Sequence, residues 1–89
     1  MEFVIITGMS GAGKTGALHV LEDIGYYCVD NLPSSLLSTL YRLCLKSEDD
    51  SMKRVAVVVD VRGNEKFEEM CSQIEHFKKH YENVKVLFF

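Results

Sequence analysis

The spacing of hydrophobic residues alternates between two patterns along the chain. Continuous apolar runs, typical of strands buried on both faces, cover 3–7 and 55–59, and two further strands are predicted over 26–29 and 84–89. Between these runs, apolar residues recur at steps of three and four, which is typical of amphipathic helices. The pattern predicts strands alternating with helices, and therefore a parallel sheet built with right-handed crossovers.

Three helices are predicted between these strands. The first runs from Lys14 to Ile24 and ends at Gly25, because glycine readily takes the left-handed conformation that stops a helix. The second begins near Pro33, and the third precedes the last strand. The expected apolar stripes are Leu36, Leu37, Leu40, Leu43 and Cys44 in the second helix, and Phe67, Met70, Cys71, Ile74, Phe77 and Tyr81 in the third.

The second half of the chain bears on the domain organisation. The valine-rich run 55–59 gives the strongest strand signal and is expected at or near the centre of the sheet. The charged stretch 46–53 is expected to be a solvated connection. The chain stops inside the apolar strand 84–89, where natural proteins more often fray into polar residues. We expect an α/β domain over 1–89, truncated after about four strands from a longer protein.

Composition narrows the classes of function. The chain has 89 residues, 47% hydrophobic and 26% charged, which is typical of one soluble globular domain. Its net charge is −3 and its basic residues are scattered, so direct nucleic-acid binding is not expected. No apolar run approaches the roughly 20 residues of a membrane span, and no secretory signal is present. A cytoplasmic location without membrane contact is expected.

Cysteine and histidine give no sign of a metal or redox centre. Cys28, Cys44 and Cys71 lack the C-x-x-C spacing, so we expect them to be reduced and buried. His76 and His80 are four residues apart, a spacing that can chelate a metal, but no third ligand accompanies them. His19 is expected to be a surface residue.

The segment from Gly8 to Thr15 carries the clearest chemistry. It matches the pattern G-x-x-x-x-G-K-[S/T] and lies between a strand and a helix, as that motif requires. Its glycines let the backbone approach phosphate oxygens closely, and the following helix adds its positive end. Lys14 would neutralise the outer phosphates, and the Thr15 hydroxyl would ligate Mg²⁺. The predicted nucleotide-binding residues here are Gly8, Met9, Ser10, Gly11, Ala12, Gly13, Lys14 and Thr15.

The alternative interpretation of this segment is a merely flexible glycine loop. The strand before the segment and the helix after it argue against this alternative. With a phosphate site predicted there, the fold class becomes that of a P-loop NTPase, with a parallel sheet and flanking helices. Lys14 is accordingly predicted to be catalytic.

A P-loop also needs a carboxylate behind its magnesium ion, and two acidic residues qualify. Asp60 follows the 55–59 strand at its carboxyl end, where open α/β sheets bind ligands, and is predicted to serve both the metal and catalysis. Asp30 ends the second strand and has two open roles, as a second magnesium ligand or as the N-cap of the helix near Pro33. Arg62 could contact a phosphate or a guanine edge, or could be an ordinary exposed arginine.

Three blocks of the sequence, 3–14, 21–33 and 57–63, resemble the RapZ/YvcJ family of bacterial nucleotide-binding proteins. The resemblance implies ATP and GTP as ligands, Mg²⁺ as cofactor and weak hydrolysis. In longer members it implies an adapter role in RNA and metabolic regulation through a C-terminal domain that is absent here. It also assigns a second nucleotide-binding motif to Asp60, Val61, Arg62 and Gly63.

Some positions depart from the family pattern. Thr15 stands where many members have serine, which keeps the hydroxyl. Gly16 stands where a helix-forming residue is expected and should weaken the start of the helix by about 1 kcal/mol. The chain also stops before the family's arginine-rich lid segment, so hydrolysis is expected to be impaired.

Two other functions stay open at this stage. In a small-molecule kinase of the adenylate-kinase type, Asp30 would orient an acceptor hydroxyl. In a pure interaction module, nucleotide would act as a conformational switch without chemistry. The residues do not choose between ATP and GTP. The edges of the predicted sheet could also be covered by a second copy, which leaves a homo-oligomer open.

Overall fold

The computed structural model describes residues 1–8, 13–61 and 66–89, which form four strands and three α-helices in alternating order. Two short 3₁₀ helices, η1 and η2, flank the second α-helix. The predicted α/β fold is confirmed. In chain order the elements are β1 (Glu2–Thr7), α1 (Lys14–Asp23), β2 (Tyr27–Val29), η1 (Ser34–Leu36), α2 (Leu37–Lys46), η2 (Asp50–Met52), β3 (Arg54–Val58), α3 (Phe67–His80) and β4 (Val84–Phe88).

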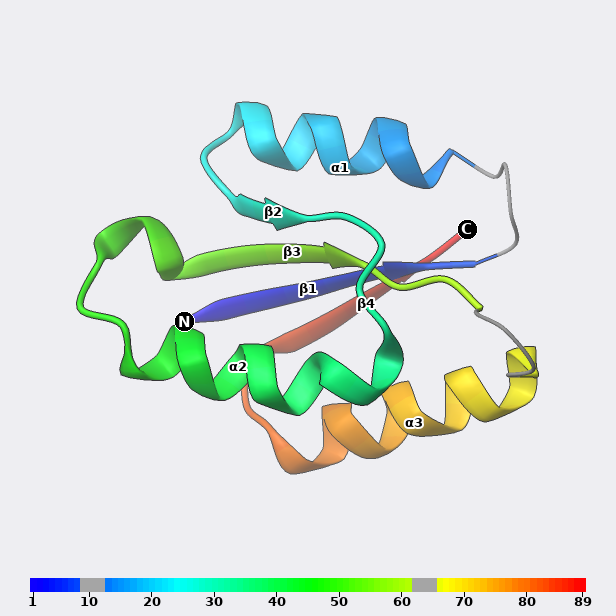
Figure 1. Cartoon of the computed structure of the whole chain (residues 1–89). Helices are drawn as coiled ribbons and strands as arrows, with labels where there is room; N and C mark the ends of the chain where they lie inside the picture. The colour runs from blue at the N-terminus through cyan, green and yellow to red at the C-terminus, as the bar shows by residue number, and fades with distance from the viewer. Residues whose placement is uncertain (9–12, 62–65) are drawn as a thin grey trace.

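The four strands form one parallel sheet in the order β2-β3-β1-β4. The valine-rich strand β3 is an inner strand, as predicted, and its Val58 pairs with Ile6 of β1. Figure 1 shows α1 on one face of the sheet and α2 with α3 on the other. The chain leaves β1 toward β2 on the first face, and leaves β3 toward β4 on the second. The carboxyl ends of β1 and β3 therefore form a topological switch point, where open α/β sheets bind ligands.

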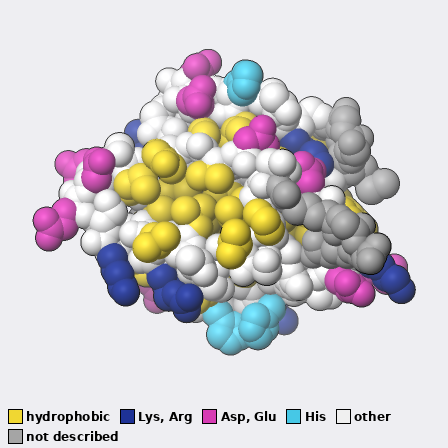
Figure 2. All heavy atoms as spheres, in the orientation of Figure 1, with side chains coloured by type: hydrophobic (Ala, Val, Ile, Leu, Met, Phe, Trp, Pro, Cys, Tyr) yellow, Lys and Arg dark blue, Asp and Glu magenta, His cyan; other side chains and the backbone are white. Residues whose placement is uncertain are grey.

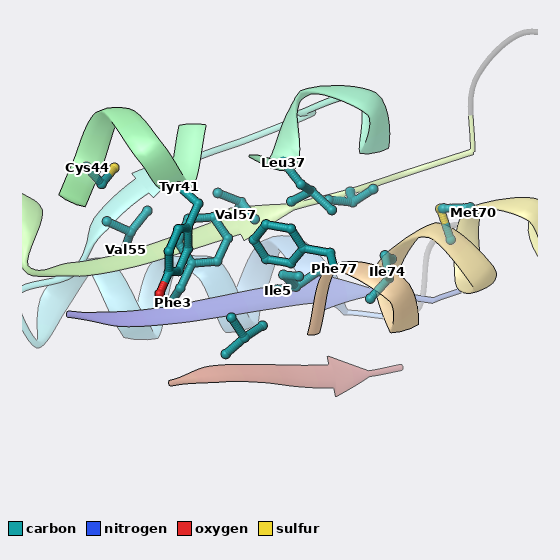
Figure 3. Close-up of a cluster of buried hydrophobic side chains, with 12 residues drawn as sticks. Phe3, Ile5, Leu37, Tyr41, Cys44, Val55, Val57, Met70, Ile74 and Phe77 are labelled. Carbon is teal, nitrogen blue, oxygen red and sulfur yellow. The ribbon is translucent and has the colours of Figure 1, made fainter. Parts of the chain in front are cut away.

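The sheet separates two cores, because successive side chains of a strand point to opposite faces. On the α2 and α3 face, the ring of Phe3 packs against Tyr41 and Phe77, with centroids 5.4 and 5.5 Å apart (Figure 3). Under α1, the buried side chains are smaller. They are Val4, Ile6, Leu18, Ala56 and Val58.

The predicted apolar stripe of the second helix was partly wrong. Leu37 and Cys44 are buried, but Leu36 is 46% exposed and Leu43 is 61% exposed. The first turn is the 3₁₀ helix η1, whose tighter winding rotates the start of the helix relative to an unbroken α-helical stripe. Tyr41 is buried instead, and its hydroxyl donates a hydrogen bond to the Glu82 carbonyl at 2.8 Å.

β2 is the edge strand on one side of the sheet. Figure 2 shows hydrophobic side chains gathered on one face of the molecule, between the positions of β2 and α2 in Figure 1. The exposed apolar residues of η1 and α2 include Leu36, Leu43 and Leu45.

Other expectations were tested as well. The stripe of the third helix is confirmed, with Met70, Ile74 and Phe77 buried. Gly25 ends the region of α1 at φ 102°, as predicted. The connection 46–53 is largely exposed and contains η2, which Asp49 caps by accepting a hydrogen bond from the Ser51 amide at 2.9 Å.

The three cysteines are free thiols, but only Cys44 is fully buried. Cys28 and Cys71 are half-buried, so the expectation of burial was wrong for these two. Burial raises the pKa of the Cys44 thiol, because the charged thiolate is disfavoured away from water. In the part of the chain that the structure describes, every helix is too short or too polar to cross a membrane.

Candidate functional site

The candidate site lies where β1 and β3 end, and backbone hydrogen bonds hold the two ends together. The Val59 amide donates to the Ile6 carbonyl at 2.9 Å, which carries the sheet pairing one residue beyond β3. The buried Thr7 hydroxyl donates to the Val59 carbonyl, also at 2.9 Å. These bonds hold the backbone before Asp60 beside the backbone before Gly8.

Gly8 begins the predicted phosphate loop and has a backbone that demands glycine. Its φ is 138°, and a Cβ atom there would lie 2.0 Å from the Phe89 carbonyl oxygen. The backbone of Phe89 is held close to Gly8 because the Phe89 amide donates to the Thr7 carbonyl at 2.9 Å. Gly13, at the other end of the loop, has φ 88° and precedes the first residue of α1 in a left-handed conformation. At both positions, any residue other than glycine would strain the backbone.

Lys14 is the first residue of α1 and points back into the site. Its side chain is only 8% exposed, and its Nζ donates to the Gly8 carbonyl at 3.1 Å. The same ammonium forms an ion pair with the Asp60 carboxylate. Three residues that the sequence predicted separately are thus in contact, although the sequence did not predict the contact itself.

Around this ion pair lie groups that could hold phosphate and metal. The N-cap residue of α1 is Gly13, which makes no side-chain hydrogen bond, and the positive end of the helix lies there. Thr15 follows Lys14 and is exposed. The Asp60 side chain is 37% exposed, so it faces both the buried lysine and solvent. The Thr15 hydroxyl and the Asp60 carboxylate are the hard oxygen donors that Mg²⁺ prefers, and the donor set therefore fits this ion.

The other predicted site residues have different positions. Met9, Ser10, Gly11, Ala12, Arg62 and Gly63 lie outside the described residues. Val61 follows Asp60 and is exposed.

Asp30 is exposed at the end of the edge strand β2, with β3 between it and β1. The residue at the N-cap of η1 is Pro33, without a side-chain hydrogen bond, so the predicted capping role of Asp30 was wrong. The chain turns too early for it, since Asn31 takes a positive φ of 62° and the Leu32 amide donates to the Val58 carbonyl. Its metal role stays a prediction.

Sequence reasoning missed the role of Thr7. In the sequence it is the last residue of a β-branched strand, and only its position opposite Val59 shows that its hydroxyl joins the two strand ends. A polar residue that closes an otherwise apolar buried run was the available signal.

Two grooves lie on the α3 side of the molecule, and the second of them reaches Thr7. One, of about 420 Å³, runs between η1 and α3 and is lined by Ser34, Gln73 and both His76 and His80. The two imidazole centroids are 4.1 Å apart, and His80 Nδ1 lies 2.9 Å from the His76 carbonyl oxygen. The described ranges contain no group of three or more His, Cys, Asp or Glu side chains arranged to hold a metal. The second groove, of about 670 Å³, lies between α3 and β4.

Comparison with known proteins places the chain in a family. The model of the RapZ-like N-terminal domain matches residues 1–89. The chain is 48% identical to a protein of Alkaliphilus oremlandii, 47% to one of Halothermothrix orenii and 46% to one of Clostridium perfringens, each named nucleotide-binding protein. Each comparison covers 99% of this chain and 30% of the relative, so the chain spans about 30% of the length of these relatives. The chain belongs to the family of RapZ-like N-terminal domains, as the resemblance in its sequence implied.

Proposed function

We propose that this chain binds ATP or GTP through its phosphates with Mg²⁺, hydrolyses them weakly, and forms the nucleotide-binding part of a RapZ/YvcJ-like regulatory adapter. The observation that carries this proposal is the contact of Lys14 with both Gly8 and Asp60 at the carboxyl ends of β1 and β3. A buried ammonium beside glycine backbone at a helix N-terminus is the arrangement that phosphate oxygens require. The names of the relatives support the same ligand class.

Each described residue has a separate part in this proposal. Lys14 neutralises the outer phosphates as a point charge, and the amides at the start of α1 donate hydrogen bonds to phosphate oxygens. Thr15 and Asp60 would hold Mg²⁺, which neutralises charge on the bridging phosphate oxygens when it is bound. Gly8 and Gly13 allow the backbone to turn around the phosphates.

The weak hydrolysis in this proposal is what the family resemblance implies, and two arginines lie in the part of the chain that the structure describes. Arg54 begins β3, at the amino end of the sheet, with its guanidinium 5.4 Å from the Tyr26 ring. Arg42 is on α2, across the sheet from α1. Neither lies beside Lys14, so neither supplies the arginine that contributes about 10³ to 10⁵ in rate in other P-loop enzymes.

A small-molecule kinase is the second candidate, because Asp30 is exposed at the end of β2 and does not cap η1. There it would orient an acceptor hydroxyl. The two functions differ in where the phosphoryl group goes. Labelled phosphate transferred to a metabolite would support the kinase, whereas free phosphate released without an acceptor would support the weak hydrolase.

Thermal unfolding with and without ligand tests the proposed binding. A ligand at 100 times its Kd stabilises the folded state by about 2.7 kcal/mol. The unfolding temperature should therefore rise with MgATP or MgGTP and should not rise with magnesium sulfate alone. An unfolding temperature unchanged by either nucleotide up to millimolar concentration would contradict the proposal.

A further inference from the structure

We infer that Asp60 makes this site select the magnesium complex of a nucleotide over the metal-free nucleotide, by holding Lys14 until a cation takes the lysine's place. This inference rests on the proposed function and concerns the same site. The contact that carries it is the ion pair between the buried Lys14 ammonium and the partly exposed Asp60 carboxylate.

The Lys14 ammonium is committed to partners within the protein. Its side chain is 8% exposed, and among the described residues it contacts the Gly8 carbonyl and the Asp60 carboxylate. An ammonium removed from water needs such partners, because an unpaired buried charge is strongly unfavourable. The ammonium has three N–H groups, so a phosphate can either take the remaining one beside the Asp60 carboxylate or replace one of these partners. Since Gly8 is part of the backbone beside β1, the partner that can yield is Asp60.

A metal-free phosphate is opposed by Asp60 in two ways. It competes with the carboxylate for the charge of Lys14, and it faces that carboxylate at close range, where the two negative charges repel each other. A divalent cation removes both costs. It can approach Asp60 from the side that is 37% exposed, compensate the carboxylate and leave Lys14 to the phosphate. Cation and phosphate should therefore favour each other at this site, as reciprocal linkage requires.

The carboxylate cannot avoid this competition by moving away with its backbone. Val59, the preceding residue, donates its amide to Ile6 and accepts the Thr7 hydroxyl, each at 2.9 Å. Val59 and Thr7 are both almost fully buried. Asp60 is thus held at the loop by the pairing of β1 with β3, and only its side chain is free to change partner.

The test compares Asp60→Asn with the unchanged 89-residue chain. Asparagine keeps the shape of the side chain but removes the charge that opposes phosphate. We expect Asp60→Asn to bind ATP in EDTA about tenfold more tightly than the unchanged chain, within the range of measured coupling between sites. We also expect Mg²⁺ to strengthen ATP binding by the variant much less than by the unchanged chain.

Asp50→Asn is the matched control. It makes the same change of net charge, at an exposed carboxylate that pairs with Lys53. It should leave both affinities unchanged. Circular dichroism should first show that each variant is folded, and Asp60→Ala serves as a second variant if Asp60→Asn is not.

The outcomes separate this inference from the proposed function. Suppose that the unchanged chain binds MgATP, but that Asp60→Asn binds metal-free ATP no more tightly than the unchanged chain binds metal-free ATP. The inference is then overturned and the proposed function stands. If Asp50→Asn tightens metal-free binding as much as Asp60→Asn, net charge explains the effect and the inference is also overturned. If neither form of ATP binds to the folded chain, the proposed function fails first.

Discussion

The two faces of the sheet differ in how much core they bury. On the α2 and α3 face, twelve described residues form the buried cluster, among them the contacting rings of Phe3, Tyr41 and Phe77. On the α1 face, five described residues do so, the largest being aliphatic. Both the strands and the helices contribute to the difference, since Phe3 comes from β1 whereas Tyr41 and Phe77 come from α2 and α3. Lys14 begins α1, the helix that covers the smaller core.

This difference suggests a division of labour within one small domain. Aromatic burial against α2 and α3 contributes most of the hydrophobic stabilisation, because that stabilisation grows with apolar area removed from water. The face that carries the site buries less apolar area and therefore contributes less of this stabilisation. Its helix begins with Lys14, whose buried ammonium is turned toward Gly8 and Asp60, and with Gly16, which weakens a helix relative to alanine.

The largest expected effect is that of Phe77→Ala, which removes the ring packed against Phe3 and Tyr41. Large-to-small changes of buried aromatic residues cost about 3 to 5 kcal/mol, so the free energy of unfolding should fall by that amount. Urea denaturation followed by circular dichroism measures it. Leu43→Ala, at an exposed position, is the control and should change stability little. A loss of under about 1 kcal/mol for Phe77→Ala would contradict the comparison.

Leu18→Ala is the corresponding test on the other face. Leu18 is buried under α1 beside Ile6 and Val58, in the smaller core. We expect a loss of about 2 to 3 kcal/mol, at the low end for buried leucine, because α1 can settle toward the sheet. Amide hydrogen exchange should rise in α1 before it rises in α3. A loss equal to that of Phe77→Ala, with exchange rising equally in both helices, would show that the faces do not differ.

The smallest expected effect is a gain from Gly16→Ala. A Cβ atom at this helical position has open space around it, and alanine favours a helix over glycine by about 1 kcal/mol. The thermal midpoint should rise by a few degrees. Gly8→Ala is the contrasting variant and should destabilise the chain, because its Cβ would collide with the Phe89 carbonyl. If Gly16→Ala destabilises the chain, the start of α1 has less room for a side chain than the structure indicates.

Much of the fold could be predicted from the sequence because the inner strands β1 and β3 are largely continuous apolar runs and the helices carry separate stripes. The strand order could not, since it depends on which way each crossover passes. The orientation of α2 was also misjudged. The 3₁₀ turn over Ser34–Leu36 displaces Leu36 from the stripe, and the buried positions of α2 follow Leu37, Tyr41 and Cys44, which turns Leu43 toward solvent.

The candidate site was predicted from its residue types and only partly from its contacts. Gly8, Lys14 and Asp60 were identified from the phosphate-loop pattern and from the end of a valine-rich strand. Their meeting depends on the register of β1 against β3, which no local pattern encodes. For the same reason the Thr7 hydroxyl was missed, because its partner Val59 is far away in the sequence.

The most direct test of the central claim is calorimetric titration of MgATP and MgGTP into the unchanged chain, Lys14→Ala and Lys46→Ala. Lys46 is an exposed lysine in the last turn of α2, so its variant makes the same charge change away from the site. The account predicts binding by the unchanged chain and by Lys46→Ala, and a loss of about 100-fold or more in folded Lys14→Ala, because the phosphates lose their charge-assisted donor. Binding by Lys14→Ala as tight as that of Lys46→Ala would contradict it.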